Sequence, residues 1–321
     1  MSEKINKPRN NLNIKLKLPS LKRVSSIIID NDTVFIVAAG FEDRRFAYMR
    51  HVSPSNGSKV LILDYRPFDE KNDLAGMMSC LKKKGVKVSE SNIIIYDRFD
   101  PHCFPNELKE KIIAMGVKRV LLDISAMSKL AILLCMDVFC ELNLDVKIFY
   151  AEAKIYGPSE KEFNSAWEDK DFYRPSIRIY TGIHKVLRVS RLSSVAMQGQ
   201  PTAAIAFMSF NEELTQALLS TVYPSRFLLI NGKPPTLSWR ENATAWIHEK
   251  LRKEWNEHDN PTERKLPKMV TSTRNYRETV QLLLDIYWKL ALDYRILLAP
   301  TGSVKGGVKM YRHSGVKVYH L

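Results

Sequence analysis

Cysteines and long hydrophobic runs are both scarce in this sequence, and each absence excludes a class of protein. The four cysteines among 321 residues form no Cys-x-x-Cys pair and no Cys/His spacing typical of a metal site. We therefore expect reduced, mostly structural thiols and no bound metal. No apolar stretch reaches the roughly 18–20 residues that a membrane-spanning helix needs. The first residues also lack the apolar segment of a secretory signal, so we expect a cytoplasmic protein with no membrane partner.

Three motifs of nucleotide enzymes and hydrolases are also missing. The sequence contains no Walker A, G-x-S-x-G or G-x-G-x-x-G pattern. This disfavours an ATPase, a serine hydrolase and a conventional dinucleotide enzyme. No cofactor is predicted.

Positive charge, by contrast, is abundant. Lysine and arginine number 49 against 35 aspartates and glutamates, a formal net charge of +14. Part of the excess lies in residues 4–23, which carry seven basic residues and no acid. Such a charge favours phosphate-bearing partners, either nucleic acid or a small ligand, although a basic solvated surface without a dedicated anion is the simpler alternative.

The hydrophobic pattern predicts an α/β fold. Buried-type strands without polar alternation, such as "TVFIVAAG" and "KRVLLDIS", are separated by helical segments, which favours parallel sheets covered on both faces. We expect a basic N-terminal arm (1–30), a first Rossmann-like unit (31–153), a connecting segment (154–200) and a second such unit (201–321).

The second unit repeats landmarks of the first in the same order. "RILLAPTGSVK" corresponds to "RVLLDISAMSK", and the terminal "GVKVYHL" corresponds to "DVKIFYA". Any two α/β units share apolar strands and turns, but here the match extends to polar residues at strand ends. We therefore predict two tandem units with mostly parallel sheets, related by a pseudo-two-fold duplication.

The candidate site lies where these strands end, because ligands of parallel α/β sheets bind beyond the carboxyl ends of the strands. Its residues follow the first and fourth predicted strand of each unit. They are Gly40, Phe41, Glu42, Arg44, Arg45, Asp123, Ser125, Ser128, Lys129, Ser209, Asn211, Thr301, Gly302, Ser303 and Lys305.

The composition of this set suits a phosphate group. A helix beginning at Ser125 or Thr301 would present backbone N–H groups to an anion, with a hydroxyl and then a lysine four residues later. Ordinary capping of a helix by the same hydroxyls is the alternative.

Asp123, Ser125 and Lys129 form an Asp-x-Ser-x-x-x-Lys pattern after a fourth strand, which resembles the signature of CARF domains, the CRISPR-associated Rossmann-fold sensors. The second unit keeps Thr301 and Lys305 but has Ala299 in place of the acid. The resemblance implies a cyclic-oligonucleotide ligand bound across two paired units, as also in the related SAVED sensors. It also implies a bacterial antiviral defence setting.

Three functions remain open at this point. The first is a sensor that binds a nucleotide or cyclic oligonucleotide and passes the signal to a partner effector protein, since no R-x-x-x-x-H nuclease pattern occurs in a late helix. The second is an enzyme, a metal-independent phosphodiesterase (ring nuclease) or nucleotide hydrolase, with Glu42, Arg44 or Lys129 in the chemistry. The third is an accessory protein that binds nucleic acid through residues 4–23 and 184–191.

Overall fold

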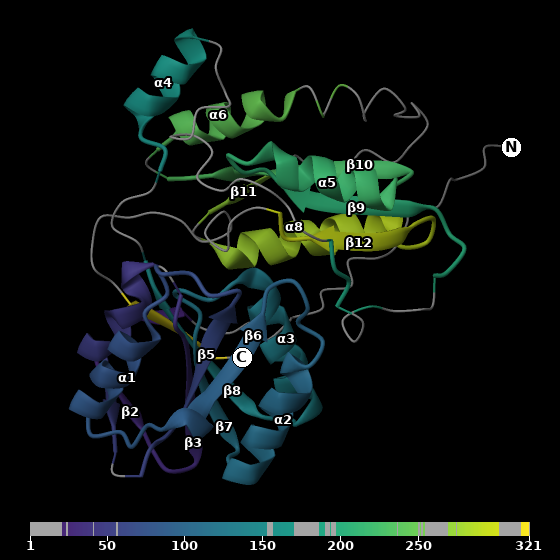
Figure 1. Cartoon of the computed structure of the whole chain (residues 1–321). Coiled ribbons are helices and arrows are strands. Elements are labelled where there is room, and N and C mark those ends of the chain that lie inside the picture. The colour runs from purple at the N-terminus through teal and green to yellow at the C-terminus, as the bar shows by residue number, and fades with distance from the viewer. Residues whose placement is uncertain are drawn as a thin grey trace, which may run out of the picture.

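Two sheets, each built mainly from parallel strands, organise the chain (Figure 1). The computed structural model describes residues 21–23, 25–40, 42–55, 57–152, 157–169, 186–189, 193, 197–235, 237–249, 251, 253, 269–273, 275–301 and 316–320. Within this part of the chain, no helix is both long and apolar enough to cross a membrane.

The first sheet has the strand order β1-β13-β8-β7-β3-β5-β6. Its five parallel strands are β3 (Thr33–Ala38), β5 (Lys59–Arg66), β6 (Ile93–Asp97), β7 (Arg119–Asp123) and β8 (Asp145–Ala151). Numbered along the chain, they lie in the order 3-2-1-4-5, which is the order of a Rossmann-like sheet.

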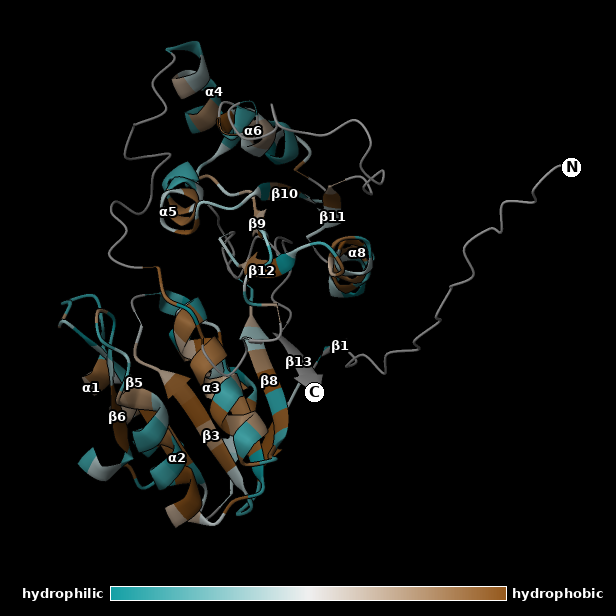
Figure 2. Ribbon diagram, turned by 90° about the vertical axis from the view of Figure 1, so that its right-hand side faces the viewer, coloured by the Kyte–Doolittle hydropathy of each residue, from teal (hydrophilic) through white to brown (hydrophobic). Residues whose placement is uncertain are grey.

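Both faces of this sheet are covered, which explains why its strands show no polar alternation. The 3-10 helix η1 (Asp43–Arg50) and helix α1 (Leu74–Lys83) pack on one face, and helices α2 (Phe104–Met115) and α3 (Lys129–Glu141) on the other. Successive residues of β3 point alternately into the hydrophobic cores on the two faces of the sheet, and nearly all are buried. The strand is therefore coloured hydrophobic along most of its length (Figure 2).

The second sheet has the order β11-β10-β9-β12, again with parallel pairing throughout. Its strands are β9 (Thr202–Phe207), β10 (Arg226–Lys233), β11 (Val270–Ser272) and β12 (Arg295–Ala299). Helix α5 (Glu212–Val222) packs on one face and α8 (Tyr276–Leu290) on the other. The strand order 3-2-1-4 matches that of the first sheet over four strands, and the prediction of an α/β fold with mostly parallel sheets is confirmed.

The last strand departs from the expected repeat. We expected the terminal segment to complete the second unit, but β13 (Val316–His320) pairs with β8 of the first sheet, and it does so antiparallel. Strand β1 (Leu21–Arg23) then pairs antiparallel with β13. Pairing partner is a tertiary property, which the apolar pattern of a strand does not encode.

Parts of the expected arm and of the expected connecting segment also form secondary structure. Strand β2 (Ile27–Ile29) pairs with β4 (Val52–Pro54), and Ile29 is buried in the first core. Helix α4 (Glu160–Glu168), within the expected connection, packs its buried Phe163 against α6 (Trp239–Ile247) of the second unit. The short 3-10 helix η2 (Glu90–Asn92) precedes β6.

Candidate functional site

The candidate site lies at the carboxyl edge of the first sheet, between β3 and β7. From the central strand β3 the chain passes to β5 on one side and returns to β7 on the other, so the loops after β3 and β7 diverge at this point. The strands of the first sheet run towards the second unit, so this edge faces it (Figures 1 and 2).

Gly40 lets these two loops approach each other. A Cβ at Gly40 would overlap the backbone carbonyl oxygen of Ala126 and lie 3.1 Å from the Ala126 Cβ. The glycine is therefore required by the close approach of the β7–α3 loop, and it brings the ends of β3 and β7 together.

The β7–α3 loop is held by its own polar groups. The backbone N–H of Ser125 donates to Asp123 Oδ1 (2.8 Å), and the Ser125 hydroxyl accepts from the N–H of Ala151 at the end of β8 (2.8 Å). Ser128 caps α3 by accepting from the N–H of Ala131, while its own N–H donates to the Tyr65 hydroxyl. The helix thus begins at Lys129 and not at Ser125, because residues 124–128 form a separate turn.

Ser125 consequently has a structural task. Its side chain is fully buried, so Ser125→Ala would leave the Ala151 N–H without an acceptor away from water. We expect the free energy of unfolding to fall by about 2 kcal/mol in urea denaturation. Ser220→Ala, which removes an exposed hydroxyl bonded to the Gln216 carbonyl, is the control; equal losses in the two variants would contradict the assignment.

Asp123 is the buried acid of the site, with an exposed fraction of 3%. Burial raises the pKa of its carboxyl to about 7, although hydrogen bonds from Ser125 and the charge of Arg44 act in the opposite direction. A carboxyl in this state changes its charge near neutral pH.

Glu42 and Arg44 form a pair beside Asp123. Arg44 Nε lies 2.5 Å from Glu42 Oε2, and its Nη1 donates to the Tyr150 hydroxyl (3.2 Å) and to the Ala151 carbonyl (3.1 Å). The guanidinium is thus joined to the end of β8, where Ser125 is also bound.

Arg45 faces away from this group. Its guanidinium lies over the Phe46 ring and 3.7 Å from the carboxylate of Asp73, the residue that caps α1. The two arginines, both expected in the candidate site, therefore contact different parts of the unit.

Lys129 joins the two units. Its ammonium donates to the backbone carbonyls of Pro300 (2.5 Å) and Thr301 (3.2 Å), which follow β12 of the second sheet. Burial lowers the pKa of Lys129 to about 8. The structure thus brings together two corners, after β7 and after β12, that the sequence comparison matched.

The Thr301 hydroxyl, like that of Ser125, forms hydrogen bonds with the backbone at the end of another strand. It donates to the carbonyl of Phe207 (2.8 Å) and accepts from the Phe207 N–H (3.0 Å), at the end of β9. Ser125 and Thr301 each hold the end of another strand of their own sheet.

The remaining predicted residues lie apart or outside the described residues. Ser209 and Asn211 form the turn before α5, where the Asn211 side chain caps the helix by accepting from the N–H of Glu213. Phe41, Gly302, Ser303 and Lys305, and residues 4–20 of the expected basic arm, lie outside the described residues.

Sequence reasoning missed the tyrosines of this edge. Tyr65 and Tyr150 lie at the ends of β5 and β8, and their hydroxyls bind the Ser128 N–H and Arg44. A tyrosine near the end of a largely buried strand is the available signal, because a buried phenol needs a polar partner.

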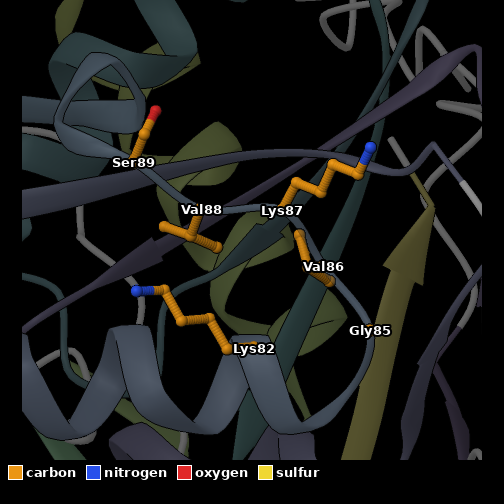
Figure 3. Close-up of a pocket in the computed structure, with 6 residues that line it drawn as sticks. All are labelled: Lys82, Gly85, Val86, Lys87, Val88 and Ser89. Carbon is orange, nitrogen blue, oxygen red and sulfur yellow. The ribbon is translucent and has the colours of Figure 1, made fainter.

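No group of three or more His, Cys, Asp and Glu side chains that could hold a metal ion occurs in the described part of the chain. A hollow of about 480 Å³ is present at the turn after α1 (Figure 3). This turn leads to β6, so the hollow lies at the opposite, amino edge of the first sheet. A scan of protein-family models finds no match to the chain, and a search of curated proteins finds none either.

Proposed function

We propose that the protein is a sensor, which binds a nucleotide or cyclic oligonucleotide at Lys129 and passes the signal to a partner effector protein. The observation that carries this proposal is the position of the Lys129 ammonium, at the start of α3 and against the Pro300 and Thr301 carbonyls. The CARF-like pattern supports the choice of ligand and a setting in bacterial defence.

The electrostatics of Lys129 favour exchange of its present partners for a phosphate. Two neutral carbonyl oxygens now accept from the ammonium, whereas a phosphate oxygen carries charge and forms a stronger hydrogen bond. The positive end of the α3 dipole lies at the same place and acts in the same direction. A bound phosphate would also raise the lowered pKa of Lys129, because an opposite charge favours the protonated form.

The same contact supports a signalling role. Lys129 belongs to the first unit, and its acceptors belong to the loop after β12 of the second. A ligand that takes over the ammonium would remove this link between the units. Binding would then change how the units are joined, which a partner protein can detect.

Binding is favoured over catalysis by the state of the other charged groups. Glu42 and Arg44 bind each other, and Arg44 is also held by Tyr150 and Ala151. Asp123 is buried and hydrogen-bonded within its own loop. These hydrogen bonds position the loop, and they would have to break before the same groups could act on a phosphodiester.

Thermal unfolding with a panel of mono-, di- and cyclic oligonucleotides tests the proposal. A ligand at a hundred times its Kd stabilises the folded state by about 2.7 kcal/mol, which raises the Tm by about 5 °C. In Lys129→Gln we expect the affinity to fall about 10- to 100-fold, the effect of losing one charge-assisted hydrogen bond.

Lys118→Gln, a variant at an exposed lysine, is the matched control and should keep the shift. The proposal fails if no member of the panel raises the Tm, or if Lys129→Gln responds as the wild type does. Conversion of the ligand to a linear product, abolished in Lys129→Gln, would show an enzyme instead.

A further inference from the structure

The C-terminal end of α1 forms a turn that reverses the chain. The N–H of Val86 donates to the Leu81 carbonyl and that of Gly85 to the Lys82 carbonyl, the pair of bonds that defines a Schellman motif. Gly85 has a φ of +82°, which favours glycine at this position, and Val86 and Leu81 are both buried. The chain beyond the turn therefore runs back along the end of the helix.

Four lysines lie in or beside this turn: Lys82, Lys83, Lys84 and Lys87. Three are exposed and Lys84 is half-buried. No acid occurs in the sequence between Asp73 and Glu90. Among the residues that the structure describes, none of the four ammonium groups has an ion-pair or hydrogen-bond partner.

Three other lysines of the same unit, by contrast, have partners. Lys59 donates to the Met115 carbonyl, Lys109 pairs with Glu141, and Lys111 donates to the Ser91 carbonyl. Stabilisation of the helix dipole accounts for Lys82 and Lys83 in the last turn of α1. It does not account for Lys87, which lies beyond the helix.

Two of the four lysines, Lys82 and Lys87, line a hollow of about 480 Å³, together with Gly85, Val86, Val88 and Ser89. Figure 3 shows Val86 and Val88 lying between the side chains of Lys82 and Lys87. Both valines are buried, so the accessible side chains of the hollow are mainly those of the two lysines. The hollow is thus a shallow surface whose positive charge comes from Lys82 and Lys87.

We propose that this lysine hollow binds the phosphate backbone of nucleic acid, without reading its sequence. A shallow surface cannot surround a small ligand, whereas a polymer can contact Lys82, Lys87 and neighbouring cations of the turn at once. No aromatic side chain or amide lines the hollow, so bases have nothing to stack on or pair with there. An anionic membrane is less suitable, because the two apolar side chains of the lining, Val86 and Val88, are buried and cannot insert.

The site is separate from the one proposed for the signal ligand. Lys129 lies at the carboxyl edge of the first sheet, and the lysine hollow lies at the amino edge, where α1 leads to β6. Failure of either proposal would therefore leave the other standing.

Binding of a fluorescently labelled DNA duplex to the full chain, measured over a series of salt concentrations, tests this inference. The variant replaces Lys82, Lys83, Lys84 and Lys87 with glutamine. The slope of log K against log salt should fall in magnitude by about 2 to 4, because each lost phosphate contact contributes about 0.9 and two to four of these lysines are close enough to take part. Replacement of the same four lysines by arginine should retain the wild-type slope.

The control replaces four other exposed lysines, Lys71, Lys118, Lys147 and Lys161, with glutamine, which removes the same charge. Equal loss of slope in both glutamine variants would show an effect of net charge alone and overturn the proposal. So would an unchanged slope in the first variant. Lysine-dependent binding to vesicles containing anionic lipid, without binding to DNA, would assign the surface to membranes instead.

Discussion

Replacing Gly40 with alanine is expected to lower the free energy of unfolding by about 3 kcal/mol, at the upper end of the cost of overpacking a core. The added Cβ would overlap the backbone carbonyl of Ala126, and a backbone atom cannot rotate away as a side chain can. Relief requires the β7–α3 loop to move from the end of β3. Because Lys129 follows this loop, the same variant should weaken ligand binding at the candidate site.

Urea denaturation measures the change, and Gly116→Ala is its control. Gly116 has a φ of +61° with open space around its Cα, so alanine there incurs only backbone strain of about 1 kcal/mol. A loss in Gly40→Ala no larger than in Gly116→Ala would show that the two loops are not closely packed.

The free energy of unfolding of Asp123→Asn is expected to rise, relative to that of the wild type, as the pH rises. Burial raises the pKa of the folded Asp123 carboxyl to about 7 from an ordinary value of 3.8. The unfolded chain therefore ionises first, and the wild type loses stability as the pH rises from about 4 through 7. The asparagine variant keeps an oxygen that can accept from the Ser125 N–H and does not titrate.

Between pH 5 and pH 8, the difference in unfolding free energy between variant and wild type should shift by about 2.5 kcal/mol in favour of asparagine, at 1.36 kcal/mol per pKa unit. Urea denaturation at the two pH values gives this difference directly. Asp100→Asn, at an exposed loop residue, controls for the change in net charge. A shift of the opposite sign would mean that Asp123 is stabilised in its ionised form.

Much of the first unit was predictable from its strands. Runs such as Val34–Ala38 carry no polar residue, and only a strand covered on both faces tolerates that pattern. The corner at Asp123–Lys129 was also identifiable, because polar residues follow a buried strand and precede an apolar helix. The start of that helix was misplaced, since Asp123 and Ser125 form a turn whose stability depends on Ala151, 26 residues further along the chain.

The site itself was predictable only in part. Sequence matching paired the corner at Lys129 with the corner at Thr301, and the structure places them in contact. The opposite directions of Arg44 and Arg45 could not be predicted, because neighbouring arginines look alike in a sequence. Their partners, Tyr150 in one case and Asp73 in the other, are chosen by the packing of β8 and α1.

The sequence by itself determined the α/β class, the parallel sheets and the polar corners at the strand ends, because hydrophobic periodicity and capping are local properties. Tertiary structure alone decided that β13 joins the first sheet, that the Ser125 and Thr301 hydroxyls bind backbone, and that Lys129 reaches Pro300. Each of these depends on which groups lie next to one another after folding. Burial then sets the chemistry of Asp123 and Lys129, since the removal of water around a charged group shifts its pKa.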